Sequence, residues 1–523
     1  MQKDVQLRLT PDKAFDDIAL RKALGIDTQR PFIILRRSID ARRKDIMVDL
    51  ICRIDPEEEV VSGMKLKDAD PTKGQCIIVG SGPAGLFSAL TLLEQGIKPI
   101  VLERGKDVHT RKIDIAKIST QGIVSSNSNY SFGEGGAGTY SDGKLYTRSK
   151  KRGENSKVLG TLVQFGAPQE ILFEAHPHIG TDKLPKIIEN IRNAIISHGG
   201  EVLFQHQVKT LIIKDGVCKG VIACDEQGGT EKKFDGPVIL AIGNAARDTF
   251  QTLVEQGVSV DAKDIAMGVR LEHPQVLIDQ IQYHSQDGRG RFLPPAEYSF
   301  TTQVDVDGRR VGVYTFCMCP GGFVVPAASG PCQVVVNGMS PSSRGSKWAN
   351  SGMVVEFPAT VTGYDQCSLT NPLRMMELQQ RLELVTYQAA NCSQRAPAQR
   401  MTDFLAQRTS QNVAPSSYAP GLTCADLHDV LPDFTSRALC IALTTFARHA
   451  PGFLTPDATL IGTETRTSSP IRITRDPQTL QSISTPGLYP CGEGAGYAGG
   501  IVSAAVDGIR CALSLAQTFI PMC

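Results

Sequence analysis

Apolar residues along the chain fall into two kinds of segment, which predict buried strands and amphipathic helices. Continuous runs at 76–79, 99–102 and 238–242 have the length of a buried strand, and each leads into a glycine or a charged residue. Repeats at helical spacing cover 184–200, with Thr181 as the expected N-cap, and two later stretches at 371–391 and 434–450. Strands that alternate with helices in this way predict an α/β architecture.

The same pattern divides the chain into three parts. Residues 1–72 combine a helix at 19–26 with strands at 31–41 and 44–54, so we expect a small N-terminal α/β domain. Residues 73–265 alternate strand and helix, and 460–523 return to this pattern. Residues 266–459 carry mainly antiparallel-type strands. The sequence therefore predicts a discontinuous Rossmann-like domain, interrupted by a largely antiparallel α+β substrate domain.

Composition restricts the classes of partner. The chain has 55 basic and 54 acidic side chains, and residues 1–73 have 15 against 14, which argues against binding to nucleic acid or to a membrane surface. No apolar run approaches the roughly 18 residues that span a bilayer. The first residues show no secretory pattern, so we expect a cytoplasmic protein whose 14 cysteines are reduced.

A glycine motif follows the first buried strand and predicts a dinucleotide. Gly80, Gly82 and Gly85 spell G-x-G-x-x-G at the start of a helix, and Glu103 follows 18 residues after Gly85, at the end of the next strand. The glycines would let the backbone approach a pyrophosphate at the helix N-terminus, and the acid would accept ribose hydroxyls. The candidate cofactor-binding residues here are Gly80, Gly82, Pro83, Ala84, Gly85, Glu103 and Arg104.

A second glycine-rich segment near the end of the chain resembles the second motif of glutathione-reductase-type FAD/NAD(P)-binding flavoproteins. It reads GLYPCGEGAGYAGGI over 487–501 and precedes a helix of small residues. The resemblance implies FAD, with Glu493 on the ribityl chain and the helix from Ile501 aimed at the flavin N1/O2 region. The strand that ends at Gly243 is similar to a further motif of the same group. The resemblance thus adds Gly243, Gly492, Glu493, Gly499, Gly500 and Ile501 as cofactor-binding candidates.

Further stretches narrow the resemblance. The segments AHPHIGTDKL, VRLEHPQ, CMCPGG, NGMS and ETRTSSPIRI, together with both glycine motifs, resemble a family of bacterial FAD-dependent dehydrogenases or oxidoreductases. That family has a small N-terminal domain ahead of the flavin domain. The resemblance implies FAD and redox chemistry but no particular substrate.

The loop GEGGAGTYSDGKL contains Gly138, Gly143 and Lys144 in the order G-x-x-x-x-G-K, which is typical of a triphosphate-binding loop. Leu145 follows where such a loop needs a hydroxyl for Mg²⁺, so a nucleoside triphosphatase is disfavoured. Related flavoproteins pass a glycine-rich segment over the pyrophosphate and flavin. By that likeness Gly135, Gly136 and Gly138 would bring backbone N–H groups to the cofactor, and Ser141 or Lys144 would line the substrate side.

Candidate catalytic side chains lie in or beside the inserted region. Cys317 and Cys319 share one face of an expected strand, so they are either a redox or substrate-facing pair or simply packed. Arg270 and His273 would clamp a carboxylate and move protons, or else form a structural pair. The flavoprotein resemblance puts Arg466 near the isoalloxazine.

Two histidines, His176 and His178, would share a face if extended, but no third ligand accompanies them, so we expect no metal.

The leading hypothesis is an FAD-dependent oxidoreductase that transfers a hydride between flavin N5 and a small organic substrate or NAD(P)H. The substrate would bind between the flavin domain and the insert. One dinucleotide fingerprint argues against a dedicated NAD(P)H domain. Two alternatives remain open: a flavin-dependent RNA-modifying protein that grips RNA with its N-terminal domain, and a non-catalytic FAD-binding protein.

Overall fold

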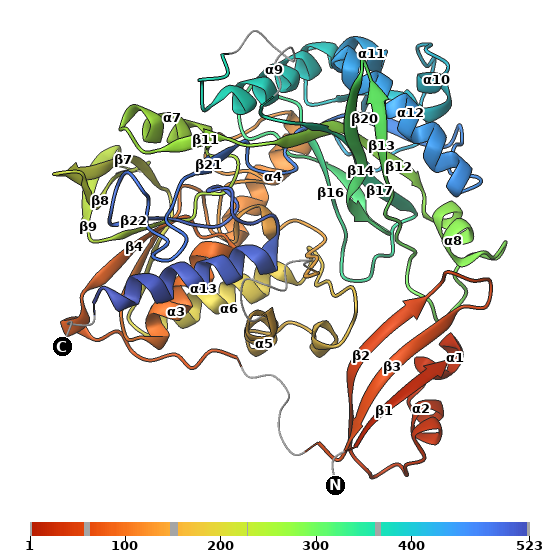
Figure 1. Cartoon of the computed structure of the whole chain (residues 1–523), viewed down its shortest axis with the longest axis horizontal. Coiled ribbons are helices and arrows are strands. Elements are labelled where there is room, and N and C mark those ends of the chain that lie inside the picture. Colours follow the sequence, from red (N-terminus) through yellow and green to blue (C-terminus); the bar gives the residue numbers. More distant parts are fainter. Residues whose placement is uncertain (1–2, 57–62, 147–154, 227, 361–367, 520–523) are drawn as a thin grey trace.

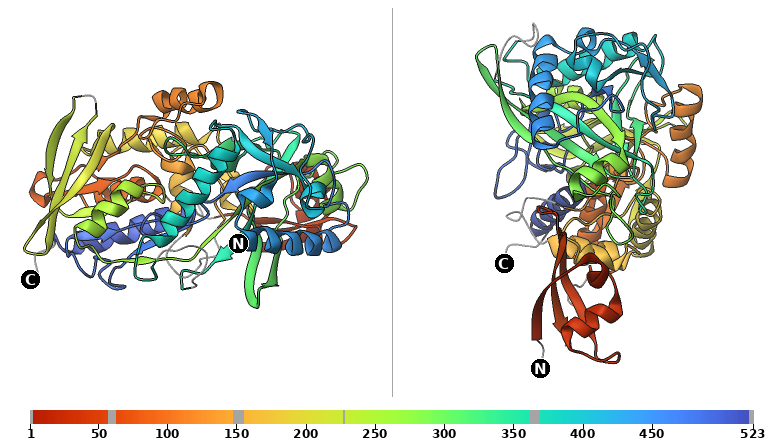
Figure 2. Two further views of the ribbon diagram at one scale, coloured as in Figure 1. Left: turned by 90° about the horizontal axis from the view of Figure 1, so that it is seen from above. Right: turned by 90° about the vertical axis from the view of Figure 1, so that its right-hand side faces the viewer.

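The structure is a computed structural model that describes residues 3–56, 63–146, 155–226, 228–360 and 368–519. It is a mixed α/β protein with three regions, shown in Figure 1 and in two further views in Figure 2. A small N-terminal sheet stands at one corner, and two larger bodies lie side by side above it.

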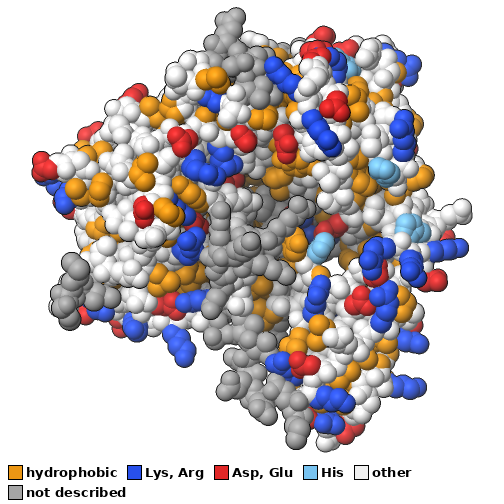
Figure 3. Space-filling model, viewed as in Figure 1, with side chains coloured by type: hydrophobic (Ala, Val, Ile, Leu, Met, Phe, Trp, Pro, Cys, Tyr) orange, Lys and Arg blue, Asp and Glu red, His pale blue; other side chains and the backbone are white. Residues whose placement is uncertain are grey.

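The N-terminal region is a three-stranded antiparallel sheet with two short helices. Its strands run in the order β1-β3-β2, and the bounds are β1 Lys3–Leu9, β2 Phe32–Asp40, β3 Met47–Ile54, α1 Pro11–Ala14 and α2 Asp17–Leu24. Every second residue of β3 is buried, so one face packs on the helices. Arg8 and Arg42 both pair with Asp40, and Arg53 pairs with Asp4. Figure 3 shows both signs of charge on this region, so it carries no unbroken basic face in that view.

The second region is built on five parallel strands in the order β22-β10-β4-β5-β6. Their bounds are β4 Gln75–Val79, β5 Lys98–Leu102, β6 Glu201–Leu203, β10 Val238–Leu240 and β22 Leu488–Pro490. One face of the sheet packs with the helices α3 Pro83–Glu94, α5 Asn155–Gln164, α6 Leu184–Ser197 and α13 Ile501–Gln517. The other face packs with the antiparallel sheet β7 His206–Lys214, β8 Val217–Asp225 and β9 Thr230–Asp235, and with α7 Arg247–Glu255.

Close packing of α3 against its neighbours depends on two glycines. A Cβ on Gly85 would lie 1.9 Å from the carbonyl oxygen of Gly80, and one on Gly508 of α13 would lie 2.2 Å from the carbonyl oxygen of Ala84. A side chain at Gly85 would displace the glycine turn, and one at Gly508 would push α13 away from α3. The first strand, the glycine turn and the two ends of this region are therefore held in one packed unit.

The third region is a seven-stranded sheet in the order β13-β14-β17-β12-β20-β18-β19, antiparallel except between β18 and β19. The strands are β12 Ile265–Pro274, β13 Thr301–Val306, β14 Arg309–Cys319, β17 Trp348–Phe357, β18 Ala396–Arg400, β19 Leu422–Cys424 and β20 Thr459–Glu464. A two-stranded ribbon of β15 Phe323–Pro326 and β16 Val336–Met339 accompanies it. Its helices are α8 Gln275–Tyr283, α9 Arg374–Ala389, α10 Met401–Leu405, α11 Leu427–Val430 and α12 Asp433–His449.

A few elements complete the chain or differ from expectation. The strands β11 Val260–Ala262 and β21 Ile471–Ile473 pair where the chain leaves and re-enters the second region. Helix α4 Val108–Gln121 was not predicted, nor were α5, α7 and α8. The prediction that Thr181 caps α6 was wrong, because Lys183 is the N-cap and Thr181 lies outside the helix. None of the described helices combines the length and the apolar character that crossing a bilayer requires.

Candidate functional site

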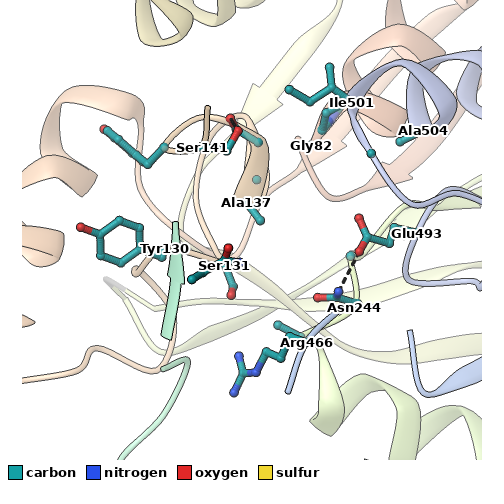
Figure 4. A pocket seen from close by; sticks show the side chains of 18 of the residues that line it. Gly82, Tyr130, Ser131, Ala137, Ser141, Asn244, Arg466, Glu493, Ile501 and Ala504 are labelled. Atoms are coloured by element: carbon teal, nitrogen blue, oxygen red, sulfur yellow. Dashed lines mark hydrogen bonds between the residues drawn. The ribbon is translucent and has the colours of Figure 1, made fainter. Parts of the chain in front are cut away.

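A cavity of about 840 Å³ lies where the carboxyl ends of the parallel strands face the third region. Its lining from the second region includes Gly80, Gly82, Pro83, Ala84, Glu103, Arg104, the loop 130–146 in part, Gly243, Asn244, Glu493, Gly499, Gly500 and Ile501. Its lining from the third region includes Tyr298, Thr315, Cys317, Cys319, Asn337 and Arg344. The carboxyl edge of a parallel sheet is where α/β proteins bind ligands. Figure 4 shows Ala137, Ile501, Glu493 and Asn244 around this open space.

The three glycines of the first motif have different structural roles. Gly80 has φ 101°, and a Cβ there would lie 2.4 Å from the carbonyl oxygen of Ala241, so only glycine fits the turn. Gly82 is the N-cap of α3, and the nearest atom to a Cβ there would be 3.9 Å away. Gly82 therefore faces open space in the cavity, and the N–H groups at the start of α3 lie beside it. This cradle fits the pyrophosphate of a dinucleotide.

Glu103 is almost fully buried, and its carboxylate accepts four hydrogen bonds from the protein. Oε2 accepts from the backbone N and hydroxyl of Ser81 at 3.0 and 2.7 Å, and Oε1 accepts from the N of Gly105 and Gly133 at 2.8 and 3.0 Å. Four donors fill the usual capacity of a carboxylate. Glu103 thus joins the first glycine turn to the loop that covers it, and its binding of ribose hydroxyls remains a prediction.

The resemblance put the glycine-rich loop 133–138 over the pyrophosphate and flavin, and in the structure part of this loop lies against the first glycine turn. The N–H of Gly135 donates to the carbonyl of Ser81 at 3.0 Å, and the N–H of Gly136 donates to that of Gly133 at 2.8 Å. These two N–H groups are therefore engaged within the protein. Gly136 and Gly138 line the cavity, whereas Gly135 packs between Thr139 and Ile188 outside it.

A buried arginine holds this loop. Arg111 of α4 is fully buried and donates to the carbonyls of Asn129, Tyr130 and Glu134 at 2.8, 2.9 and 2.8 Å. Burial lowers its pKa to about 10, so the guanidinium stays charged at neutral pH. Sequence reasoning missed Arg111, because nothing in its local pattern separates it from an exposed helical arginine.

The segments from the end of the chain form the next wall. Gly243 has φ 70° and, like Gly499 and Gly500, would present a Cβ to open space. The Nδ2 of Asn244 donates to Oε1 of Glu493 at 2.8 Å (Figure 4). Burial raises the pKa of Glu493 to about 7, against the opposing effects of Lys263 and Asn244.

Helix α13 begins beside this wall. Gly500 is its N-cap and Ile501 its first residue, so the N-terminal N–H groups of a long helix lie at the cavity. Gly492 lies outside the lining, where a Cβ would meet that of Ala84 at 2.8 Å and its N–H donates to Asp507. The open glycines and the two helix N-termini fit a long dinucleotide such as FAD.

Comparisons with known proteins agree with this cradle. The model of an FAD-binding domain matches residues 73–120, and that of the C-terminal-like domain of FAD-dependent proteins matches 264–467. A domain of unknown function matches 1–55. An uncharacterised protein of Clostridium beijerinckii is 41% identical over 506 residues, which cover 93% of this chain and 92% of the relative. The chain belongs to the same family as this clostridial protein.

The two FAD-related matches support FAD as the cofactor of this family member, while the narrower likeness to glutathione reductase stays a prediction. Among solved structures, a variant of FrdA from E. coli quinol fumarate reductase aligns with 88% of this chain and 71% of its own, at 12% identity and a TM-score of 0.38. A 3-ketosteroid dehydrogenase of Rhodococcus jostii aligns with 86% and 100%, at 12% identity and a TM-score of 0.36. These scores are too low to carry an argument about this chain.

In this family member, a bulge at the end of β14 turns Cys317 into the cavity. The pairing of β14 with β17 shifts between Phe316 and Cys319, and Cys317 has φ 43°. Cys317 is open to the cavity and Cys319 is buried, so the two do not share one strand face as expected, although both line the cavity. Although Cys317 is open to the cavity, the protein around it displaces bulk water and raises its pKa to about 12, and burial also raises the pKa of Cys319, so both are neutral thiols at pH 7.

Arg466 lines the cavity and shares one carboxylate with another arginine. Glu383 accepts two hydrogen bonds of 2.7 Å from Arg247 and two of 3.0 and 3.1 Å from Arg466. Arg466 also donates to Ser329 at 2.7 Å and to Gln333 at 3.0 Å. Two guanidinium groups with one carboxylate leave a net positive charge at this wall.

The remaining predicted residues are placed differently. His273 lies in the core outside the cavity lining, where Nε2 bonds the carbonyl of Phe453 at 2.8 Å and burial lowers its pKa to about 4. Arg270 is also fully buried, and it pairs with Glu464 at 2.8 Å, so neither residue is open to a substrate. Their burial follows from β12, which is covered on both faces over nearly its whole length. Arg104 does line the cavity, where its guanidinium binds Asp248 and lies over the ring of Phe132.

The two histidines do not form a common site. His176 lines the cavity and contacts Glu297 at 3.3 Å, while His178 contacts the carbonyl of Ser342 at 3.2 Å. Elsewhere, among the described residues, Cys491, Asp507 and Cys511 come close enough to share an ion. Arg475 already donates to Asp507 at 2.6 and 3.0 Å and to Cys511 at 3.3 Å, so a cation there is the guanidinium itself.

Proposed function

We propose that the protein is an FAD-dependent oxidoreductase that transfers a hydride between a small organic substrate and the flavin. One observation carries the proposal. A single cavity runs from the open glycines of the nucleotide cradle to charged and thiol side chains of the third region. Its size, about 840 Å³, lies within the roughly 300–1,000 Å³ of small-molecule sites, and ordered polar groups line both ends.

The cofactor end would hold FAD through its backbone. Gly82 and the start of α3 would receive the pyrophosphate, and Glu493 with Asn244 would receive hydroxyls of the ribityl chain. The N-terminus of α13 would direct its positive end toward the ring system. When bound, FAD supplies hydride transfer at its N5 atom.

The substrate end would orient the reacting molecule and exclude water. Arg466 is held by Ser329, Gln333 and Glu383, so its charge is fixed in direction rather than free to follow solvent. Cys317 would touch the substrate as a neutral thiol, because its pKa of about 12 removes it as a thiolate nucleophile. NAD(P)H is the alternative donor. The single dinucleotide fingerprint of the sequence is assigned to FAD, so NAD(P)H would enter from the substrate side.

The test is the absorption spectrum of the purified protein, followed anaerobically while NADH, NADPH, alcohols and organic acids are added one at a time. We expect a flavin spectrum that one class of donor bleaches and oxygen or another acceptor restores. A colourless protein that takes up no added FAD would overturn the assignment of FAD as the cofactor. A flavin that no donor bleaches would favour a non-catalytic FAD-binding protein instead.

A further inference from the structure

Lys144 lies on the substrate-side wall of the cavity, on backbone that is pinned in place. The N–H of Leu145 donates to the carbonyl of Pro177 at 2.9 Å, and the N–H of Ile179 donates to that of Gly143 at 3.2 Å. Lys144 forms an isolated antiparallel bridge with His178 between these bonds. Its side chain is half-buried and lines the cavity. A lysine on such rigid backbone presents its ammonium to a defined place.

The other charged groups at this end already have partners. Arg344 pairs with Asp142 at 2.7 Å and with Glu297 at 2.6 Å, and His176 contacts the same Glu297. By contrast, across the ranges that the structure describes, Lys144 makes no ion pair and its ammonium no hydrogen bond. Lysine is rarely withdrawn from water without a partner, because the unpaired charge loses solvation. An unpaired ammonium in a cavity wall therefore points to a ligand of opposite charge.

The ammonium of Lys144 influences the pKa values of three neighbouring groups. Its positive charge works against burial to lower the pKa of Cys317 and of Cys319, and it also lowers the pKa of Glu297. The effects fit the geometry, because Lys144, Cys317 and Cys319 all line the same cavity.

Asn337 borders the same place and offers a further donor. The adjoining Gly338 packs against Arg270, since a Cβ there would lie 2.0 Å from Nη2 of Arg270. This Nη2 also donates to the carbonyl of Cys317, so Arg270 links the backbone next to Asn337 with Cys317. The Oδ1 of Asn337 accepts from the N–H of Gly338 at 2.7 Å, and among the described residues its Nδ2 has no acceptor. An ammonium and an amide N–H₂ thus face the cavity around Cys317.

We propose that Lys144 binds the carboxylate of an organic acid substrate at this end of the cavity, with Asn337 as a second donor. The assignment rests on the proposed function. Arg344 and Lys144 carry two positive charges at this wall, and Asp142 and Glu297 carry two negative ones. A singly charged carboxylate adds one negative charge to this balanced wall, whereas a phosphate dianion would add two. A neutral group would leave the ammonium unpaired.

The experiment uses the FAD-loaded protein and matched probes that differ in charge. Propionate, crotonate and benzoate, and the corresponding primary amides, are titrated while the flavin absorption band is monitored for a saturable shift. We expect the wild-type protein to bind at least one acid more tightly than its amide. Lys144→Met should lower the affinity for that acid by about tenfold to a hundredfold, as expected for the loss of a charge-assisted hydrogen bond. The affinity for the amide should not change. Lys144→Arg should keep most of the preference.

Lys186→Met is the matched control, because Lys186 lies on α6 with a 71% exposed side chain, outside the cavity lining. Equal acid binding by Lys144→Met and wild type would overturn the proposal, and so would a wild-type protein that binds none of the three acids. Loss of FAD from Lys144→Met, with thermal stability retained, would also overturn it by assigning the lysine to the cofactor. Acid binding that depends on Lys144 in a protein whose flavin no donor reduces would instead refute the oxidoreductase.

Discussion

Arg270 donates a hydrogen bond of 2.7 Å from Nη2 to the carbonyl oxygen of Cys317. Cys317 has φ 43°, a left-handed conformation that a residue with a side chain adopts only when its surroundings hold it. Arg270 is itself fixed by Glu464 at 2.8 Å and by Asn350 at 2.9 Å. A buried ion pair between the neighbouring strands β12 and β20 therefore holds the bulge that turns a thiol into the cavity.

The first prediction concerns that ion pair. Arg270→Met should lower the free energy of unfolding by about 3–5 kcal/mol, because it leaves Glu464 buried without its countercharge. Burial already raises the pKa of Glu464, so the unpaired carboxyl would take up a proton at higher pH than before. Urea unfolding at pH 8 measures the loss. The double variant Arg270→Met/Glu464→Met should recover most of it, and a single-variant loss below about 1 kcal/mol would refute the role.

The second prediction concerns the thiols. Cys317 is open to the cavity, yet a pKa near 12 leaves little thiolate at pH 8, so we expect its alkylation by iodoacetamide to be at least about a hundredfold slower than that of the exposed Cys424. Mass spectrometry of the labelled peptides over time gives both rates. Equal rates at pH 8 would show that Cys317 ionises as readily as an exposed thiol, and this would make it a candidate nucleophile.

Much of the cofactor cradle could be predicted because it is encoded over short stretches. Gly80, Gly82 and Gly85 lie in one turn between a buried strand and a helix, and α13 begins at Ile501, directly after its glycines. Spacing within such stretches determines their local geometry. The apolar run before Gly243 predicted a buried strand in the same way, and Gly243 lines the same cavity.

The contacts within the substrate wall could not be predicted, because they join residues far apart in the chain. Arg344 binds Asp142 across 202 positions, and Arg270 binds Glu464 across 194. Local sequence gives no sign that the first arginine lines a cavity while the second is fully buried. The local sequence does not predict the bulge at Cys317 either, since the bulge depends on how β14 pairs with β17.

The third prediction concerns two glycines of the first motif: Gly82, where the cofactor would approach the backbone, and Gly85, where the helix packs against the turn. Gly82→Ala should leave the thermal stability of flavin-free protein nearly unchanged, because the new Cβ meets no atom closer than 3.9 Å, but it should lower FAD affinity by intruding where the pyrophosphate would bind. Gly85→Ala should instead destabilise the fold, because its Cβ would lie 1.9 Å from a carbonyl oxygen. Flavin fluorescence titration and thermal unfolding report the two effects. Unchanged FAD affinity in Gly82→Ala would mean that the cofactor does not approach this residue.

The fourth prediction uses Glu493, whose pKa is raised to about 7 from the ordinary value of 4.5. A carboxyl with a raised folded-state pKa holds its proton more tightly in the native state. Its contribution is therefore most favourable at low pH, and it is lost as pH rises from about 4.5 through about 7. Glu493→Gln removes this titration while keeping an oxygen that can accept from Asn244.

The Glu493→Gln variant should therefore gain stability relative to wild type as pH rises from 5 to 8, by up to about 3 kcal/mol. Urea unfolding of flavin-free protein at pH 5, 6, 7 and 8 measures the difference. Asp476→Asn is a useful comparison, because hydrogen bonds from the backbone N–H and the hydroxyl of Thr479 lower the pKa of Asp476, so its difference from wild type should stay constant over this range. Parallel curves for Glu493→Gln and wild type would mean that Glu493 is ionised throughout, and that its carboxylate is far better solvated in the cavity than its burial beside Asn244 implies.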